Sequence, residues 1–189
     1  MLTTNGLSGL LDALDASPWG ATTGRRREAA ARRPLYTAEQ RRRRDATPWT
    51  LVQGVLAPVQ FAVFLVSLGL VLNFLATGDG LAVATASIVV KTLLLYTIMV
   101  TGCVWEKVVF GRFLFAPAFF WEDVFSMLVL ALHTAYLAAL LTGFGDASGQ
   151  MLLALAAYAA YLINALQFVL KLRSARLDEA RAERGGLAA

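Results

Sequence analysis

Four apolar stretches, each long enough to cross a lipid bilayer, constrain this chain more than any other feature of its sequence. They cover residues 51–76, 81–105, 118–141 and 151–170, and a membrane-spanning helix requires roughly 20 mainly apolar residues. Because 58% of the chain is hydrophobic, little of it remains for a separate soluble core. We therefore expect an all-α, polytopic membrane protein whose four transmembrane helices form a bundle.

The positive charges alternate between the segments that connect these stretches. Nine of the 17 Lys and Arg residues precede the first stretch, Lys107 and Arg112 lie between the second and third, and five end or follow the fourth. The connections at residues 77–80 and 143–149 contain neither residue type. Since cytoplasmic loops carry the excess of Lys and Arg, the pattern predicts that the N and C termini are both cytoplasmic.

Composition divides the chain into three parts. Residues 1–34 are rich in Arg, Gly, Ala and Ser without sustained periodicity, and we expect a disordered extension there. Residues 35–177 form the transmembrane domain, and residues 178–189 form a charged tail that continues the last helix into solvent. The arginines crowd beside the first span, so anionic lipid headgroups are their expected partner and nucleic acid is not.

Polar residues recur on single faces of the predicted helices. In the first span, Gln53, Gln60 and Ser67 are seven residues apart. In the third span, four residues are separated by four, seven and three positions, which places them on one side of a helix: Glu122, Ser126, His133 and Tyr136. A polar stripe in lipid must face protein or a water-filled cavity, so both faces are predicted to point into the bundle.

Small residues also recur at four-residue intervals. Ala131, Ala135 and Ala139 follow this spacing in the third span, and Ala156 and Ala160 follow it in the fourth. Such spacing allows two helices to approach closely in lipid. We expect these alanines to lie at helix–helix contacts.

Two ionisable residues lie near the middle of the predicted membrane spans. His133, the only histidine, is roughly 16 Å deeper than Glu122 at the rise of an α-helix, and Lys91 has a similar depth in the second span. A charged lysine at that depth costs about 2.5–3.5 kcal/mol on insertion scales. Lys91 is therefore either a functional residue or a hydrogen-bond partner of Gln60 or Asn164, and His133 is either a functional residue or a structural one.

The most unusual stretch is WEKVVFGRFLFAPAFFWEDVF, at residues 105–125, where eight aromatic rings are interleaved with Glu106, Glu122 and Asp123. Aromatic residues gather at membrane interfaces, and acids are favoured near helix N-termini, so neither feature alone requires a site. Their combination provides flat apolar surfaces beside protonatable groups. We consider this stretch the best candidate for chemistry.

Several kinds of chemistry are disfavoured by the sequence. Cys103 is the only cysteine, which excludes paired-thiol redox chemistry and a cysteine metal cluster. The chain contains no Gly-rich phosphate loop, no serine nucleophile elbow and no His–carboxylate cluster at helical spacing. Nucleotide chemistry and a tightly held catalytic metal are therefore not expected.

Four segments resemble the 3-vinyl (2-vinyl) bacteriochlorophyllide hydratases: LYTAEQRRRRDATPWTLVQGVLAPVQF, SIVVKTLLLYTIMVTG, WEKVVFGRFLFAPAFFWEDVFSMLVLALHT and YLINALQFVLKLR. The resemblance covers residues 35–177. It implies a hydro-lyase of bacteriochlorophyll a biosynthesis that converts the C3 vinyl group of chlorophyllide a or 3-vinyl bacteriochlorophyllide a to a 1-hydroxyethyl group. It also implies a multi-pass protein of the bacterial inner, intracytoplasmic photosynthetic membrane.

The implied reaction assigns roles to the candidate residues. Water is the co-substrate, no cofactor is needed, and magnesium enters only within the pigment. Glu122 or Asp123 would protonate the vinyl terminus, and Glu106 or the other carboxylate would orient water. His133 would ligate the pigment's magnesium or relay a proton. The expected substrate-binding residues are Lys91, which would pair with a pigment carboxylate, together with Trp105, Phe119, Phe120, Trp121, Ser126 and Tyr136.

Two other function classes compete with the hydratase. A non-catalytic tetrapyrrole-binding or photosystem assembly protein would use the same aromatic stretch and His133 without turning the pigment over. A small transporter or proton channel would explain Lys91, His133 and the polar stripes, although the four spans lack an evident inverted repeat. Neighbouring enzymes of the pigment pathway are further expected partners.

Overall fold

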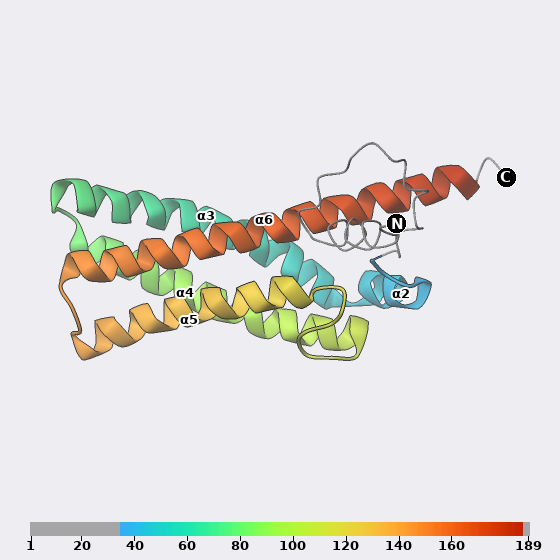
Figure 1. Ribbon diagram of the computed structural model, residues 1–189, viewed down its shortest axis with the longest axis horizontal. Coiled ribbons are helices and arrows are strands. Elements are labelled where there is room, and N and C mark those ends of the chain that lie inside the picture. The colour runs from blue at the N-terminus through green and yellow to red at the C-terminus, as the bar shows by residue number, and fades with distance from the viewer. Residues whose placement is uncertain (1–34, 187–189) are drawn as a thin grey trace, which may run out of the picture. The chain divides into compact units, whose positions relative to one another are not determined.

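A computed structural model describes residues 35–186, which form five helices and no strands (Figure 1). The expectation for residues 1–34 lies outside the described residues. The helices are α2 (Ala38–Ala46), α3 (Pro48–Thr77), α4 (Leu81–Phe110), α5 (Phe120–Thr142) and α6 (Ala147–Gly186).

The four predicted spans correspond to α3, α4, α5 and α6. Each of these helices contains a segment long and apolar enough to cross a membrane, so the predicted all-α architecture with four helices of membrane-spanning length is confirmed. Most predicted ends differ from the observed ones by a few residues. Helix α6 differs more, because it extends well past residue 170 to Gly186, as the charged continuation of the fourth span predicted.

Local capping signals set several helix ends. Thr37 and Gln40 form a reciprocal capping box at the start of α2, which satisfies two backbone N–H groups that otherwise lack partners. Thr47 accepts a hydrogen bond from the backbone of Trp49, and Pro48 is the first residue of α3, where proline loses no hydrogen bond. As a result, the basic helix α2 ends at Ala46 and the first long apolar helix, α3, begins only two residues later.

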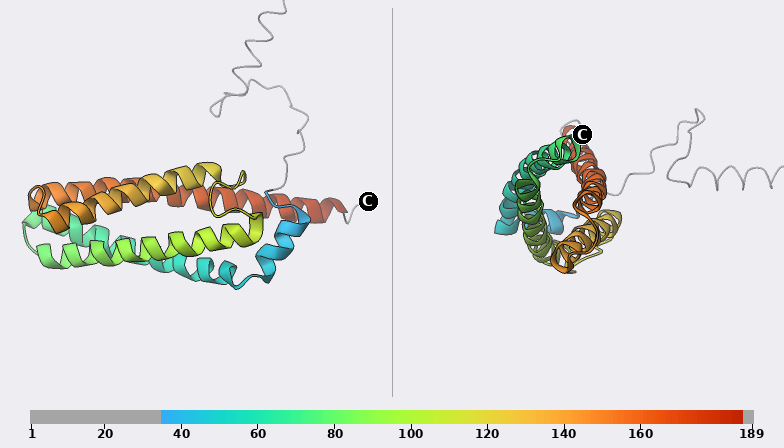
Figure 2. Two further views of the ribbon diagram at one scale, coloured as in Figure 1. Left: turned by 90° about the horizontal axis from the view of Figure 1, so that it is seen from below. Right: turned by 90° about the vertical axis from the view of Figure 1, so that its left-hand side faces the viewer.

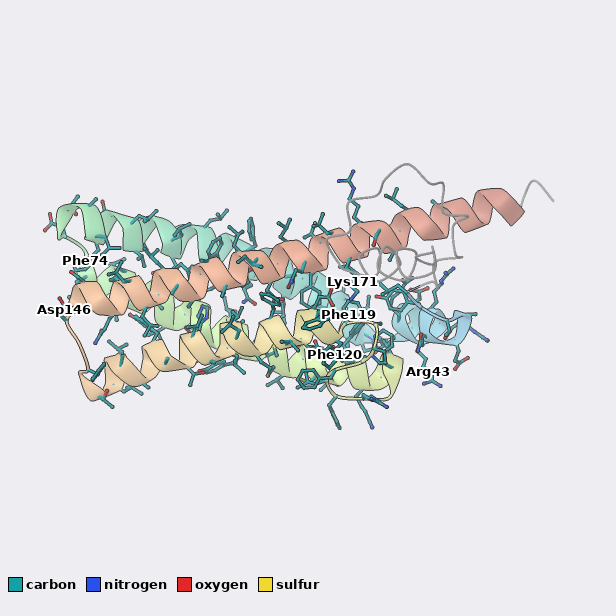
Figure 3. All side chains as sticks on the ribbon, in the orientation of Figure 1. Arg43, Phe74, Phe119, Phe120, Asp146 and Lys171 are labelled. Atoms are coloured by element: carbon teal, nitrogen blue, oxygen red, sulfur yellow. The ribbon has the colours of Figure 1, made fainter. Side chains whose placement is uncertain are left out.

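The helices surround the bundle interior in the order α3, α4, α5, α6 (Figure 2). Helices α3 and α4 pack along their length, as do α5 and α6, whereas α4 and α5, and α3 and α6, approach at fewer points. The bundle is therefore two helical hairpins with two looser seams. Figure 3 shows Arg43 of α2 and Lys171 of α6 at one end, with Phe74 and Asp146 at the other.

The core between the hairpins combines apolar and polar side chains. The ring of Phe64 in α3 lies 5.4 Å from that of Tyr158 and 5.0 Å from that of Tyr161, both in α6. Gln60 and Ser67 are buried, as their seven-residue spacing predicted. All four members of the α5 polar stripe are buried as well, so that prediction is also confirmed.

The prediction for the alanine series is wrong for three of its five residues. Ala131, Ala135 and Ala156 are exposed on the outer surface of the bundle, whereas Ala139 is buried and Ala160 is packed against the core. Among the described side chains of α6, the buried alanines are Ala154, Ala157 and Ala175. In a membrane, lipid chains accept an alanine as readily as a neighbouring helix does, so small-residue spacing does not by itself identify a packed face.

Candidate active site

Two acids from different helices meet at the α2 end of the bundle. Glu106 lies near the end of α4 and Asp123 in the first turn of α5, and their carboxyl groups are close enough to share a hydrogen bond. Glu106 is 6% exposed and Asp123 is 4% exposed. Because an ionised carboxylate can only accept a hydrogen bond, a bond within this pair requires a proton on one of the two acids.

The loop between α4 and α5 covers the pair with its backbone. The backbone N–H of Phe115 donates to Oδ2 of Asp123 at 2.7 Å, and that of Ala116 donates to Oε2 of Glu106 at 3.4 Å. Phe115 has a φ of 58°, a left-handed conformation that costs a bulky residue about 1–3 kcal/mol. The loop therefore adopts a strained conformation in which its N–H groups face the two acids.

Glu122 faces a different neighbour from Asp123. Its Oε2 lies 2.5 Å from Nζ of Lys171 in α6, and the Lys171 ammonium also lies 5.0 Å from the centre of the Phe119 ring. Adjacent helical residues point about 100° apart, which explains why one acid reaches α6 and the other reaches α4. Glu122 thus belongs to an ion pair, and Asp123 belongs to the carboxyl pair.

An aromatic cluster adjoins the two acids. The rings of Trp105 and Phe119 are 5.8 Å apart and nearly perpendicular, and Phe119 stacks on Phe168 at 5.8 Å. Trp105 precedes Glu106 in the chain, and the Phe119 carbonyl accepts the backbone N–H of Asp123. The cluster therefore provides aromatic surfaces beside the carboxyl pair.

The other two predicted aromatic residues lie elsewhere. Phe120 is 44% exposed and Trp121 is 67% exposed, with their rings 5.5 Å apart. Figure 3 shows Phe120 and Phe119 at the same end of the bundle. The structure thus brings Trp105 and Phe119 to the acids and leaves Phe120 and Trp121 on the outer surface, next to the buried site.

Deeper in the bundle, one polar contact joins α5 to α6. Asn164 donates from Nδ2 to the Ser126 hydroxyl at 2.8 Å, and both residues are buried. The Asn164 oxygen, Oδ1, has no hydrogen-bond partner within the described part of the chain. Ser126 lies one turn beyond Glu122 on the same face of α5, so the contact continues the polar interior from the acids toward the membrane centre.

Lys91, His133 and Tyr136 form another buried polar group, farther along α5 from the acids. All three are fully buried, Lys91 is close enough to His133 to act on it electrostatically, and the Tyr136 hydroxyl faces Thr85 of α4. Lys91 Nζ lies 3.6 Å from the centre of the Tyr161 ring and makes no hydrogen bond to a described residue. The predicted bond from Lys91 to Gln60 or Asn164 is therefore not formed, because the amine packs on an aromatic face instead.

Sequence reasoning missed Lys171 and the backbone donors of the α4–α5 loop. Lys171 is seven residues from Asn164, so helical periodicity places both on one face of α6, and this spacing could have identified it. No comparable signal marks Phe115 or Ala116, since their role depends on the loop conformation. Among residues 35–186 as far as they are described, no group of three or more His, Cys, Asp or Glu residues could hold a metal ion.

Comparisons with known proteins agree on one family. A family model described as 2-vinyl bacteriochlorophyllide hydratase matches residues 36–174. A protein named 2-vinyl bacteriochlorophyllide hydratase from Cereibacter sphaeroides is 72% identical over 150 residues, covering 79% of this chain and 93% of that protein. Its namesake from Rhodobacter capsulatus is 67% identical over 157 residues, covering 83% and 91%. No solved structure matches the chain.

Proposed function

The chain belongs to the 2-vinyl bacteriochlorophyllide hydratase family, and from this premise we propose that it adds water to the C3 vinyl group of a chlorin or bacteriochlorin pigment. It is a hydratase of bacteriochlorophyll synthesis. Chlorophyllide a and 3-vinyl bacteriochlorophyllide a are the proposed substrates, and the product carries a 1-hydroxyethyl group. Membership fixes the class of reaction, and the buried carboxyl pair is the single observation that carries the mechanism below.

Hydration of a vinyl group on a conjugated ring needs one acid and one base. The acid delivers a proton to the terminal carbon, and the vinyl π electrons form the new C–H bond. The positive charge that develops on the carbon next to the ring is spread by conjugation. The water oxygen then bonds to that carbon, and the base accepts the proton that the water loses. A pair of carboxyl groups sharing one proton supplies both functions.

The two acids differ in how strongly the loop backbone stabilises their negative charge. Asp123 accepts the 2.7 Å bond from Phe115, and Glu106 accepts the 3.4 Å bond from Ala116. Hydrogen bonds to an ionised oxygen stabilise it, so the better-bonded Asp123 is the carboxylate. Glu106 is then the general acid, and Asp123 is the base that orients and deprotonates water.

The shared proton is restored in each cycle. After Glu106 protonates the vinyl group, Asp123 takes a proton from water, and a proton passes back across the hydrogen bond between them. The overall reaction consumes one water and changes no cofactor oxidation state, so it requires no redox cofactor. Magnesium is part of the pigment substrate in this scheme.

The remaining candidate residues would hold the pigment. Trp105 and Phe119 would form an aromatic wall beside the acids. Ser126 and Tyr136 line the interior along the same face of α5, and Lys91 supplies a cation for a pigment carboxylate. Phe120 and Trp121 lie on the outer surface, where a flat apolar ring arriving through the membrane would first contact them.

Charge asymmetry supports an orientation for the protein in its membrane. The end that carries α2, the α4–α5 loop and the C-terminal part of α6 holds the Arg and Lys clusters, while the connections at the opposite end contain none. By the positive-inside rule the charged end is cytoplasmic, and its arginines would contact anionic headgroups. We place the protein in the photosynthetic inner membrane, where neighbouring pathway enzymes could exchange pigment with it.

The function is tested by incubating the detergent-solubilised protein with chlorophyllide a in ¹⁸O-water. A product heavier by one labelled water, detected by mass spectrometry together with a blue shift in absorption, is the expected result. Glu106→Gln and Asp123→Asn should each slow product formation by about 100- to 10,000-fold. Glu39→Gln is the matched control, because Glu39 forms ion pairs only on the exposed surface of α2.

Two outcomes would contradict parts of this proposal. Pigment that binds but stays unchanged in the wild-type protein would favour a non-catalytic tetrapyrrole-binding or assembly role. Correctly inserted Glu106→Gln and Asp123→Asn variants that both retain the wild-type rate would show that the carboxyl pair is not the acid and base.

A further inference from the structure

His133 has one fixed nitrogen and one free nitrogen. Its Nδ1 lies 2.8 Å from the backbone carbonyl oxygen of Val129, and a carbonyl can only accept a hydrogen bond, so Nδ1 carries the hydrogen. The other nitrogen, Nε2, therefore has an available lone pair. It has no hydrogen-bond partner among the described residues, although the His133 side chain is completely buried.

This arrangement is typical of a metal-ligating histidine. Such histidines almost always donate their other ring N–H to a carboxylate, a backbone carbonyl or water, which fixes the tautomer and the ring orientation. A buried acceptor without a partner is unfavourable inside a membrane protein, so the free Nε2 indicates a ligand that can accept its lone pair.

The surroundings of His133 do not suit a free metal ion. A protein site for a free transition or alkaline-earth ion usually needs three or more ligands, and no such group exists within the part of the chain that the structure describes. Lys91 lies nearby, and its ammonium form would repel a free divalent cation. A metal already chelated by the four nitrogens of a macrocycle differs on both counts, since it needs one axial ligand and its charge is neutralised by the ring.

The looser seams of the bundle give a flat ring a way to reach this nitrogen. His133 is in α5, and its neighbours across the interior come from both hairpins: Lys91 belongs to α4, and Tyr158, with its ring 5.9 Å from the imidazole, belongs to α6. Helices α4 and α5 approach each other at fewer points than the two helices of either hairpin do. A local separation of α4 from α5 beside His133 would give the ring a path to Nε2.

We propose that Nε2 of His133 is the axial ligand of the magnesium in the bacteriochlorophyllide substrate, an inference that rests on the proposed function. The same ligation positions the vinyl group. Asp123 is ten residues from His133, about 15 Å along the helix axis, and the His133 side chain tilts toward the N-terminus of α5, the end at which Asp123 lies. The macrocycle then extends from His133 past Ser126 and Asn164, so that its vinyl edge faces the carboxyl pair.

The single histidine permits a test on the unaltered sequence. Protein carrying ¹⁵N-histidine and a histidine-free affinity tag gives one pair of imidazole ¹⁵N signals, because His133 is the only histidine. Adding chlorophyllide a should shift the Nε2 signal strongly and leave the Nδ1 signal protonated. Pheophorbide a, the same pigment without magnesium, should leave Nε2 close to its pigment-free position. Equal shifts with both pigments, or none with either, would overturn the assignment.

A binding experiment adds a second, independent measurement. His133→Ala should weaken chlorophyllide a binding by at least about tenfold, measured by absorption titration, with little effect on pheophorbide a. Added imidazole should restore part of the lost affinity. Thr134→Ala is the matched control, since Thr134 is the next residue in α5 and faces outward to Tyr96. An equal loss of affinity for both pigments would show a packing role and overturn the proposal.

The labelled-water assay separates this inference from the proposed function. If the wild-type protein hydrates the pigment but the Nε2 signal shifts equally with chlorophyllide a and pheophorbide a, the proposed ligation is wrong and the hydratase function stands. If the Nε2 signal reports magnesium but no labelled product forms, the ligation stands and the proposed function fails.

Discussion

Glu122 and Lys171 form an ion pair that joins the first turn of α5 to α6, with Oε2 and Nζ 2.5 Å apart. Both side chains are largely shielded from solvent, at 10% exposed for Glu122 and 24% for Lys171. This ion pair connects α5 to α6 beside the two carboxyl groups of Glu106 and Asp123. Glu122, the neighbour of Asp123 in the sequence, is therefore bound to Lys171. Of these two neighbouring acids, Glu122 makes a structural contact and Asp123 belongs to the candidate catalytic pair.

We predict that Lys171→Met destabilises the protein more than the double change of Lys171→Met with Glu122→Gln. The single variant leaves a mostly buried carboxylate without its partner, which we expect to lower the free energy of unfolding by about 1–3 kcal/mol. The double variant removes that charge and should recover most of the loss. Thermal unfolding of the four members of this cycle in one detergent measures the coupling, and additive losses would show that the two residues do not interact.

The carboxyl pair makes a different prediction for its double variant. In the proposed mechanism Glu106 and Asp123 share one proton and act in one cycle, so removing the second acid should add little once the first is gone. The variant with Glu106→Gln and Asp123→Asn should therefore be within about tenfold of the slower single variant, in single-turnover measurements of vinyl hydration. Losses that multiply would instead indicate two independent contributions to the rate.

Hydropathy and helical periodicity predicted much of this structure because both depend on local spacing. The four spans follow from the length of the apolar runs, and the burial of Glu122, Ser126, His133 and Tyr136 follows from their positions on one helix face. The same periodicity could not show whether an alanine faces another helix or lipid. The prediction that Ala131 and Ala135 are packed is therefore wrong, and both are exposed.

The pairing of the acids required tertiary structure. Glu106 and Asp123 are 17 positions apart and come from different helices, so their contact depends on how the α4–α5 loop turns and on the packing of α4 against α5. The sequence placed Glu106, Glu122 and Asp123 in one candidate region without indicating which two would meet. The position of Phe115 in a left-handed conformation, with its N–H toward Asp123, also has no signature in the residue type.

The strain at Phe115 can be measured with a matched pair of variants. Phe115→Ala and Phe115→Gly both remove the ring and its contact with Phe120, so their difference reports on the backbone alone. Glycine adopts a φ of 58° without a Cβ penalty, and Phe115→Gly should therefore be more stable than Phe115→Ala by about 1 kcal/mol. Thermal unfolding compares the two, and both should keep most hydratase activity because the N–H donor to Asp123 remains. Equal stability would mean that the loop adopts another conformation at this position.

Lys91 should show opposite effects on stability and on pigment binding. Its Nζ is fully buried over the Tyr161 ring without a hydrogen-bond partner among the described residues, and an unpaired amine in the membrane interior is unfavourable. We therefore expect Lys91→Met to stabilise the pigment-free protein by about 1–3 kcal/mol, seen as a higher midpoint of thermal unfolding.

The same substitution should weaken binding of pigments that carry a free carboxylate. If Lys91 pairs with the propionate of chlorophyllide a, Lys91→Met should lower affinity for chlorophyllide a by about tenfold or more, since a hydrogen bond to a charged group contributes about 1.5–3 kcal/mol. Lys91→Met should leave affinity for the propionate methyl ester of the same pigment nearly unchanged, because the uncharged ester cannot form an ion pair with Lys91. An equal loss of affinity for the acid and for the ester would show that Lys91 does not bind the pigment carboxylate. A loss for the acid alone would explain why the protein keeps a buried amine that lowers its stability.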